Sequence, residues 1–182
     1  MGALELGLLA AMCWGFHDVC VRFISQKTPI SACILTVLIV GLIFHIGLMI
    51  PTKEITVISK SAFVLATIAG VSFVIASFCL YYAFKRGPVK LVAPLIASYP
   101  ILSISWAIWI ETPVSKFQIL AVLAIIFGVS IVAVLSDISE EKIPPIGKTI
   151  TLSLIASIAF ACTFATGQAA AELSPHMSVT LI

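Results

Sequence analysis

Charged side chains are scarce in this sequence, and long apolar runs take their place. Among 182 residues there are 10 Lys or Arg and 8 Asp or Glu, whereas 61% are hydrophobic and the mean hydropathy is +1.21. This composition cannot supply the polar surface of a water-soluble domain. The formal net charge of +2 is too small and too dispersed to indicate nucleic-acid binding. We therefore predict an all-α integral membrane protein, a bundle of transmembrane helices that contacts the lipid bilayer.

The sequence also lacks the motifs of common enzymes and metal sites. No H-E-x-x-H, no G-x-S-x-G and no glycine-rich phosphate loop is present, which argues against an enzyme. The five cysteines lie in apolar runs without a C-x-x-C pair, so we interpret them as small packing residues. No metal or other cofactor is implied. The first apolar run has no basic leader and no A-x-A site, so we expect a retained span rather than a signal peptide.

Six segments are long and apolar enough to cross roughly 30 Å of hydrocarbon, which takes about 20 helical residues. We place these segments at residues 3–24, 30–50, 62–84, 89–110, 115–136 and 147–171. Hydroxyl-proline pairs predict helix starts at Thr28-Pro29, Thr112-Pro113 and Ser174-Pro175, and the third pair would open a seventh helix.

The segment 89–110 contains two prolines, Pro94 and Pro100, within an otherwise uncharged run from Leu91. A proline inside a helix frees the carbonyl four residues earlier, which at membrane depth must find a partner in a neighbouring helix or a protein-lined cavity. We therefore predict a broken helix beside an interior pathway. Tyr99 lies near the middle of the span, where an interfacial anchor is out of place. It either faces a cavity or bonds a freed carbonyl of a merely curved helix.

The first span carries ionisable residues that are costly in a membrane and hence functional candidates. His17 and Asp18 would bind a proton or a polar substrate group. The alternative is interfacial: Arg22 reaches the headgroups, and Asp18, four residues earlier, neutralises it. Trp14, near the middle of the span, is a candidate for lining the cavity.

Other polar aromatic residues have simpler interpretations. His45 is expected to be a satisfied or interfacial histidine. Tyr81, Tyr82, Trp106 and Trp109 lie near span ends, where an aromatic belt at the headgroups is the default explanation.

An internal repeat is indicated when residues 8–29 are set against residues 154–175 without a gap. Small residues recur every four positions in both spans, a pattern that lets helices approach closely in lipid. They are Ala3, Gly7, Ala11 and Gly15 in the first span and Ser153, Ser157, Ala161, Ala165 and Ala169 in the sixth. A repeat of five helices would place its two copies in opposite orientations, as in many secondary transporters.

The sequences WGFHDVCVRF and LYYAFKRGPVKLVAPLIASYPILSISWAIWIETPVSKFQILAVLAIIFGVSIVAV resemble the drug/metabolite transporter superfamily, specifically its EamA-type transporters. The resemblance implies ten helices in two inverted five-helix repeats, with helices three and four of each repeat lining a central pathway. It divides this chain into a first repeat at 1–137, a polar inter-repeat loop at 138–148 and the start of a second repeat at 149–182. On this interpretation the chain is a truncated member.

The resulting hypothesis is a secondary transporter of small metabolites in the plasma (inner) membrane that works by alternating access. Its substrate pathway would involve Trp14, His17, Asp18 and Tyr99, together with the carbonyls freed by Pro94 and Pro100. The alternatives are a non-transporting membrane partner, bound to a second copy or to another membrane protein through its small-residue faces, and a fragment without independent transport. The orientation is open, because the basic residues favour an external N-terminus, whereas the resemblance implies cytoplasmic termini.

Overall fold

The computed structural model describes residues 3–52, 58–135 and 146–173, and these ranges form helices joined by short connections. The helices are α1 (Ala3–Ile24), α2 (Ile30–Thr52), α3 (Lys60–Arg86), α4 (Val89–Ile96), α5 (Tyr99–Trp109), α6 (Lys116–Leu135) and α7 (Ile146–Leu173). No strand occurs in the described ranges. The inter-repeat loop expected at 138–148 lies mostly outside them, and so does the helix start expected at Ser174-Pro175.

Five stretches of the described chain are long and apolar enough to span a membrane. They are Glu5–Ile24, Ile30–Leu48, Lys60–Arg86, Val89–Trp109 and Ile146–Leu173; a sixth apolar stretch, Lys116–Ile131, is shorter. The predicted all-α membrane bundle is thereby confirmed.

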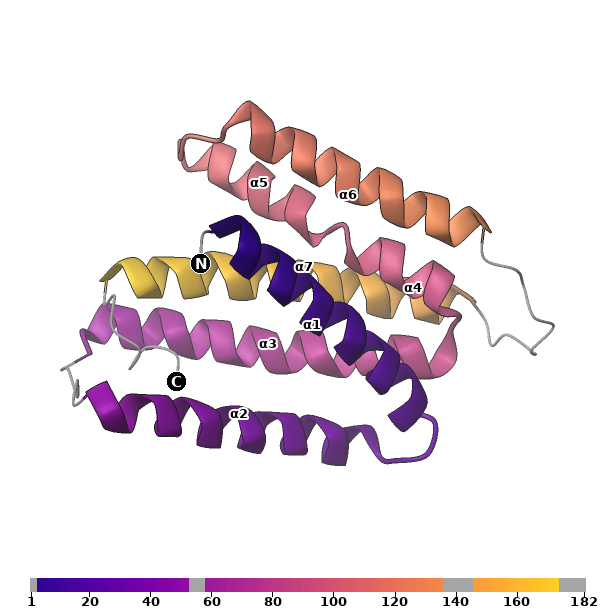
Figure 1. The fold of residues 1–182 in the computed structure, drawn as a ribbon, viewed down its shortest axis with the longest axis horizontal. Helices are drawn as coiled ribbons and strands as arrows, with labels where there is room; N and C mark the ends of the chain where they lie inside the picture. The colour runs from indigo at the N-terminus through magenta and orange to yellow at the C-terminus, as the bar shows by residue number, and fades with distance from the viewer. Residues whose placement is uncertain (1–2, 53–57, 136–145, 174–182) are drawn as a thin grey trace.

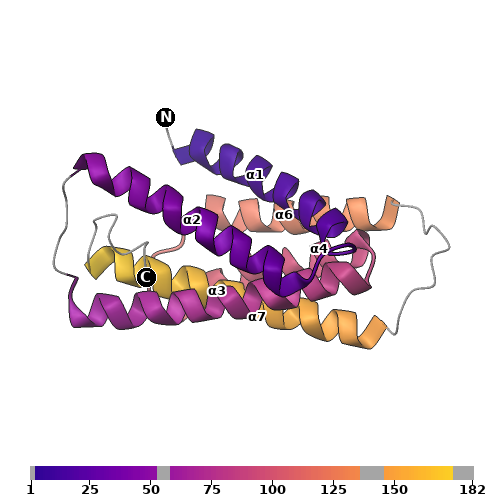
Figure 2. The same cartoon turned by 90° about the horizontal axis from the view of Figure 1, so that it is seen from below.

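The centre of the bundle is the antiparallel pair α3 and α7, which run side by side along its length (Figures 1 and 2). α1 and α2 pack on α3, whereas α4 and α5 pack on α7 and are covered by α6. Ala76 and Ala83 of α3 and Ser153 and Ala156 of α7 are completely buried. Small side chains bring the two backbones close together, which favours van der Waals packing where lipid offers no hydrophobic driving force.

The small residues that recur at every fourth position form one ladder on α1 (Gly7, Ala11 and Gly15) and one on α7 (from Ser153 to Ala169). The two ladders have different surroundings. In α7, Ser153 and Ser157 are buried against the rest of the bundle. In α1, Gly7, Ala11 and Gly15 are exposed. A Cβ atom added at Gly7 or Gly15 would meet nothing within 4 Å. The chain therefore uses one small-residue face for its own core and leaves the other open.

The helix start expected at Thr112-Pro113 is wrong, because α6 begins at Lys116. Ser115 and Gln118 form a capping box. The backbone N–H of Gln118 donates to Ser115 Oγ at 3.2 Å, and the backbone N–H of Ser115 donates to Gln118 Oε1 at 2.7 Å. This reciprocal pair satisfies two backbone donors, whereas the Thr112-Pro113 cap would satisfy one.

Candidate functional site

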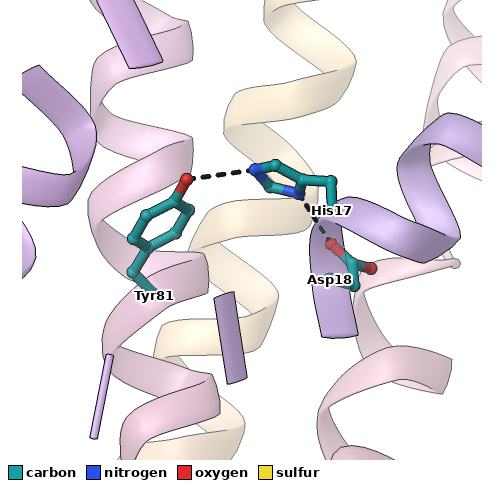
Figure 3. Close-up of polar contacts among 3 residues, drawn as sticks. All are labelled: His17, Asp18 and Tyr81. Carbon is teal, nitrogen blue, oxygen red and sulfur yellow. Dashed lines mark hydrogen bonds and ion pairs between the residues drawn. The ribbon is translucent and has the colours of Figure 1, made fainter. Parts of the chain in front are cut away.

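A polar chain of three residues links α1 to α3 (Figure 3). The His17 ring lies between two partners: its Nδ1 is 3.1 Å from Asp18 Oδ1, and its Nε2 is 3.0 Å from the Tyr81 hydroxyl. An ionised carboxylate only accepts hydrogen bonds, so Nδ1 is the donor in the contact with Asp18 when that carboxylate is ionised. The other nitrogen then accepts from Tyr81 when the ring is neutral and donates to it when the ring is protonated. The structure thus joins His17 and Asp18, two of the predicted residues, to one that was not predicted.

Tyr81 corrects an expectation drawn from the sequence. Its place near the end of a span predicted an interfacial belt, but its side chain is 3% exposed and bonded to His17. The neighbouring Tyr82 is 46% exposed, and Trp106 and Trp109 are also exposed, as a belt requires. Successive residues of a helix point about 100° apart, so adjacent tyrosines can face the core and the lipid.

Two further polar contacts join the end of α1 and the turn after it to the end of α3. The Arg22 guanidinium donates to the Phe84 carbonyl, and Gln26 Nε2 donates to the Lys85 carbonyl at 3.4 Å. One of the two interpretations of the sequence gave Arg22 a headgroup role with Asp18 as its neutralising partner. In the structure, Asp18 contacts His17, and Arg22 donates to a carbonyl at the end of α3, where a positive charge complements the helix dipole.

Aromatic rings from four helices gather around Phe160 of α7. Trp14, Phe73 and Tyr99 contact the Phe160 ring at centroid distances of 5.8, 6.2 and 6.3 Å. Trp14 also packs edge-on against His17 at 5.4 Å. This Phe160 cluster brings the predicted residues Trp14 and Tyr99 together around one side chain. Phe160 was missed in the sequence, where a lone phenylalanine in an apolar run has no distinguishing signal.

The predicted broken helix is present, with its break at Ala97 and Ser98 between α4 and α5. Pro94 stands inside α4, whereas Pro100 stands in the first turn of α5, where a missing amide hydrogen is tolerated. Ser98 Oγ donates to the Leu95 carbonyl at 2.6 Å and lies 2.9 Å from Ser157 Oγ of α7. Because Ser98 has one hydroxyl proton, Ser157 is the donor in the second bond. The hydroxyl of Ser98, and not that of Tyr99, therefore bonds a backbone carbonyl at the break. The Tyr99 ring packs against Phe160 and Phe164.

Two cavities adjoin the His17–Tyr81 hydrogen bond. The larger, about 260 Å³, lies among α1, α2 and α3 and is lined mainly by apolar side chains, with Ser25, Thr28 and Thr36 among the lining residues. The smaller, about 10 Å³, lies next to Trp14, Phe73 and Phe160. His17 and Tyr81 line both cavities. The bond therefore lies between the larger cavity and the Phe160 cluster.

The remaining candidates have local roles. His45 Nδ1 bonds the Gly41 carbonyl of its own helix at 2.8 Å, which confirms a satisfied histidine. All five cysteines are free thiols. Among the described residues, no group of three or more His, Cys, Asp or Glu side chains is placed to hold a metal ion.

Comparison with known proteins assigns most of the sequence to a family. Residues 1–134 match the EamA-like transporter family. The chain belongs to the EamA-like transporter family. An uncharacterized protein of Methanocaldococcus jannaschii is 28% identical over 133 residues, which cover 72% of this chain and 96% of that protein. No solved structure matches the chain.

Membership of the EamA-like family supports a membrane transporter role and an integral membrane location in contact with lipid. The family match contains the His17–Asp18–Tyr81 chain and both halves of the broken helix. Phe160 and Ser157, which complete the site, lie in α7 beyond the matched residues. The site therefore combines the EamA-like segment with a helix that follows it.

Proposed function

We propose that this protein is a secondary transporter of small metabolites in the plasma (inner) membrane, working by alternating access. The observation that carries the proposal is the broken helix α4–α5 beside the Phe160 cluster. Discontinuous helices at membrane depth form substrate sites, because their free backbone groups face a protein-lined space rather than lipid. Trp14, Tyr99 and the turn between Pro94 and Pro100 are the proposed pathway residues, with His17 and Asp18 as polar contacts.

We also propose that residues 1–137 form a first repeat, that 138–148 connect the repeats and that 149–182 begin a second, inverted repeat. Two observations support this division. The family match ends at residue 134, within α6. α7 then packs on α3, α4 and α5 and carries the small-residue ladder that aligns with that of α1.

Uptake or efflux of a mixed metabolite panel by the 182-residue chain in proteoliposomes tests the proposal. We expect at least one metabolite to equilibrate faster than in protein-free liposomes. The variant Tyr99→Ala should slow that metabolite, because it removes a ring from the Phe160 cluster. The variant Tyr82→Phe, altered at an exposed position outside the cluster, should transport as the unchanged chain does. A panel that no well-folded preparation transports would contradict the proposal.

The exposed ladder on α1 favours a second candidate, a non-transporting partner that binds a second copy or another membrane protein. Gly7, Ala11 and Gly15 form a face suited to close helix contact, and they have no partner helix within the described chain. Absence of transport together with stable association through α1 would favour this function.

A further inference from the structure

We propose that the protein binds an anionic phospholipid at the end of the bundle where α1 and α3 end. Its headgroup contacts lysine side chains, and one of its acyl chains occupies the larger cavity. Two independent features carry this inference, the lining of that cavity and the distribution of charge along the bundle. The inference does not depend on the proposed transport function, because lipid binding is measured without a substrate.

The larger cavity lies between α1 and α2, which both pack on α3. Val21 and Ile24 of α1 and Ala32 and Val37 of α2 are among the apolar residues that line it. Its volume of about 260 Å³ is below the roughly 300–1,000 Å³ of sites that enclose a drug-sized molecule. A single acyl chain is slender and apolar, so it suits both the size and the lining of this cavity.

The polar residues that line the cavity already have hydrogen bonds within the protein. His17 and Tyr81 bond each other, and Thr36 Oγ1 donates to the Ala32 carbonyl at 2.8 Å. Ser25 Oγ donates to a carbonyl of its own turn at 3.4 Å. A polar metabolite in the cavity would lose hydrogen bonds to water without gaining replacements from these side chains. An acyl chain has no hydrogen bonds to lose, so the bonding pattern favours the lipid.

The cavity extends to the turn between α1 and α2, where Ser25 and Thr28 are lining residues and the exposed Lys27 lies between them. Gln26 of this turn donates to the Lys85 carbonyl at 3.4 Å, and the Lys85 side chain is also exposed. Both lysines lie next to the ends of apolar spans, at the level of the headgroups. A lysine ammonium attracts phosphate. A molecule with an anionic head and an apolar chain therefore fits the two features together.

Positive charge is concentrated at this end of the bundle. Within the described ranges, the basic residues at this end are Arg22, Lys27, Lys85, Arg86, Lys90 and Lys148. The described acidic residues other than Asp18 lie at the opposite end; they are Glu5, Glu111 and Glu172. Residues 136–145, outside the described ranges, include three acidic residues and one lysine, so even if all of them faced this end its basic residues would outnumber its acidic ones. Basic clusters beside membrane spans attract anionic lipid.

Native mass spectrometry of the full chain in detergent tests the headgroup contact, with phosphatidylglycerol and phosphatidylcholine of the same acyl chains as probes. We expect phosphatidylglycerol to bind at least about tenfold more tightly. Replacing Lys27 and Lys85 together with glutamine should abolish this preference. Replacing Lys60 and Lys116 together with glutamine removes the same charge from the opposite end and should preserve it. Equal affinity for the two lipids, or an equal loss in the two double variants, would overturn the headgroup contact.

A filled cavity tests the place of the acyl chain. Ala32→Phe puts a ring at the cavity wall and should weaken phosphatidylglycerol binding about fivefold or more, which corresponds to the usual cost of overpacking. Ser31→Phe is the matched control, because Ser31 is exposed and is not a lining residue. Glycerol 3-phosphate carries the phosphate without acyl chains and should not displace the lipid. Displacement by glycerol 3-phosphate, or equal binding by the two phenylalanine variants, would overturn the place of the chain.

The unchanged chain provides a measurement that does not depend on how a variant folds. Cys20 and Cys33 line the cavity, whereas Cys13 is an exposed thiol elsewhere on α1. We expect phosphatidylglycerol to slow the labelling of Cys20 and Cys33 by N-ethylmaleimide and to leave the labelling of Cys13 unchanged. Equal labelling of Cys20 and Cys33 with and without the lipid would overturn the acyl-chain site. Protection by a member of the metabolite panel and not by the lipid would overturn it too, and would assign the cavity to a substrate.

Discussion

Gly87 illustrates how a single residue fixes the joint between the two central helices. It ends α3 with φ −125°, a backbone conformation that is open to any residue. Space is the constraint, because a Cβ atom added there would lie 2.5 Å from Thr149 Cγ2 of α7. Thr149 is 1% exposed, so it has little room to move aside. The glycine is therefore required by the approach of α7 and not by the turn.

We expect Gly87→Ala to lower the free energy of unfolding by about 1–3 kcal/mol, the usual effect of overpacking. Thr149→Ser removes the colliding methyl group, so the double variant should lose less than the sum of the two single variants. Thermal unfolding in detergent, followed by size-exclusion chromatography, measures these changes. Gly128→Ala is the control, since a Cβ atom there meets nothing within 4 Å. Additive losses would show that Thr149 does not cause the defect.

Glu111, by contrast, has an unusual backbone conformation. Its φ is 58°, in the left-handed region that favours glycine. The turn is a Schellman motif: the Thr112 amide donates to the Ala107 carbonyl at 2.9 Å, and the Glu111 amide donates to the Ile108 carbonyl at 3.1 Å. Glu111 therefore has a structural role at this turn.

Replacing Glu111 with glycine should raise the unfolding free energy by about 1 kcal/mol, because the left-handed conformation then costs little. Glu111→Ala removes the same charge but keeps the Cβ atom. Its thermal midpoint should therefore not exceed that of the unchanged chain. If alanine stabilises as much as glycine, the effect belongs to the charge and not to the backbone.

Several site residues could be predicted from the sequence because their chemistry is unusual for a membrane span. Trp14, His17, Asp18 and Tyr99 each place a polar atom deep in an apolar run. Tyr81 could not be predicted, because its distance along the helix fits an interface, and only the rotation of α3 against α1 buries it.

At the scale of elements, the broken helix could be predicted from its prolines, but the way its turn is satisfied could not. The helix breaks at Ala97 and Ser98 rather than at either proline. The partner, Ser157, lies 59 residues away on α7. A contact between distant segments depends on how the helices pack, which local patterns do not specify.

Removing the Ser157 hydroxyl measures how much the hydrogen bond between Ser98, at the helix break, and α7 contributes to stability. We expect Ser157→Ala to lower the unfolding free energy by about 0.5–1.5 kcal/mol, since Ser98 then loses its donor in a buried interface. Ser105→Ala is the matched control, because Ser105 is exposed and bonds the Ile101 carbonyl of its own helix. The thermal midpoint in detergent distinguishes the variants, and equal midpoints would mean that the Ser98–Ser157 bond contributes nothing.

For the whole molecule, the fold class and the approximate ends of the long helices could be predicted from hydropathy, because lipid requires long apolar spans. Which helices pack against one another could not be predicted, because in a membrane protein the sides that face lipid and the sides that face other helices are both apolar. The two small-residue ladders look alike in the sequence, yet one is buried in the bundle and the other is exposed. The exposed ladder on α1 can therefore be tested as a contact with a second molecule.

Gly15→Leu should weaken self-association of the protein if α1 provides the contact. A Cβ atom added at Gly15 has nothing within 4 Å, and the position is exposed, so we expect folding to be little affected. Across a close helix pair, however, the added side chain would separate the backbones and raise the dissociation constant at least about tenfold, or about 1.4 kcal/mol. Analytical ultracentrifugation in density-matched detergent measures this constant. Gly47→Leu on α2 is the matched control, because Gly47 is equally unobstructed. Equal association of the two variants would exclude α1 as the contact, and a weakened Gly15→Leu alone would identify the α1 ladder as the face that meets a second copy.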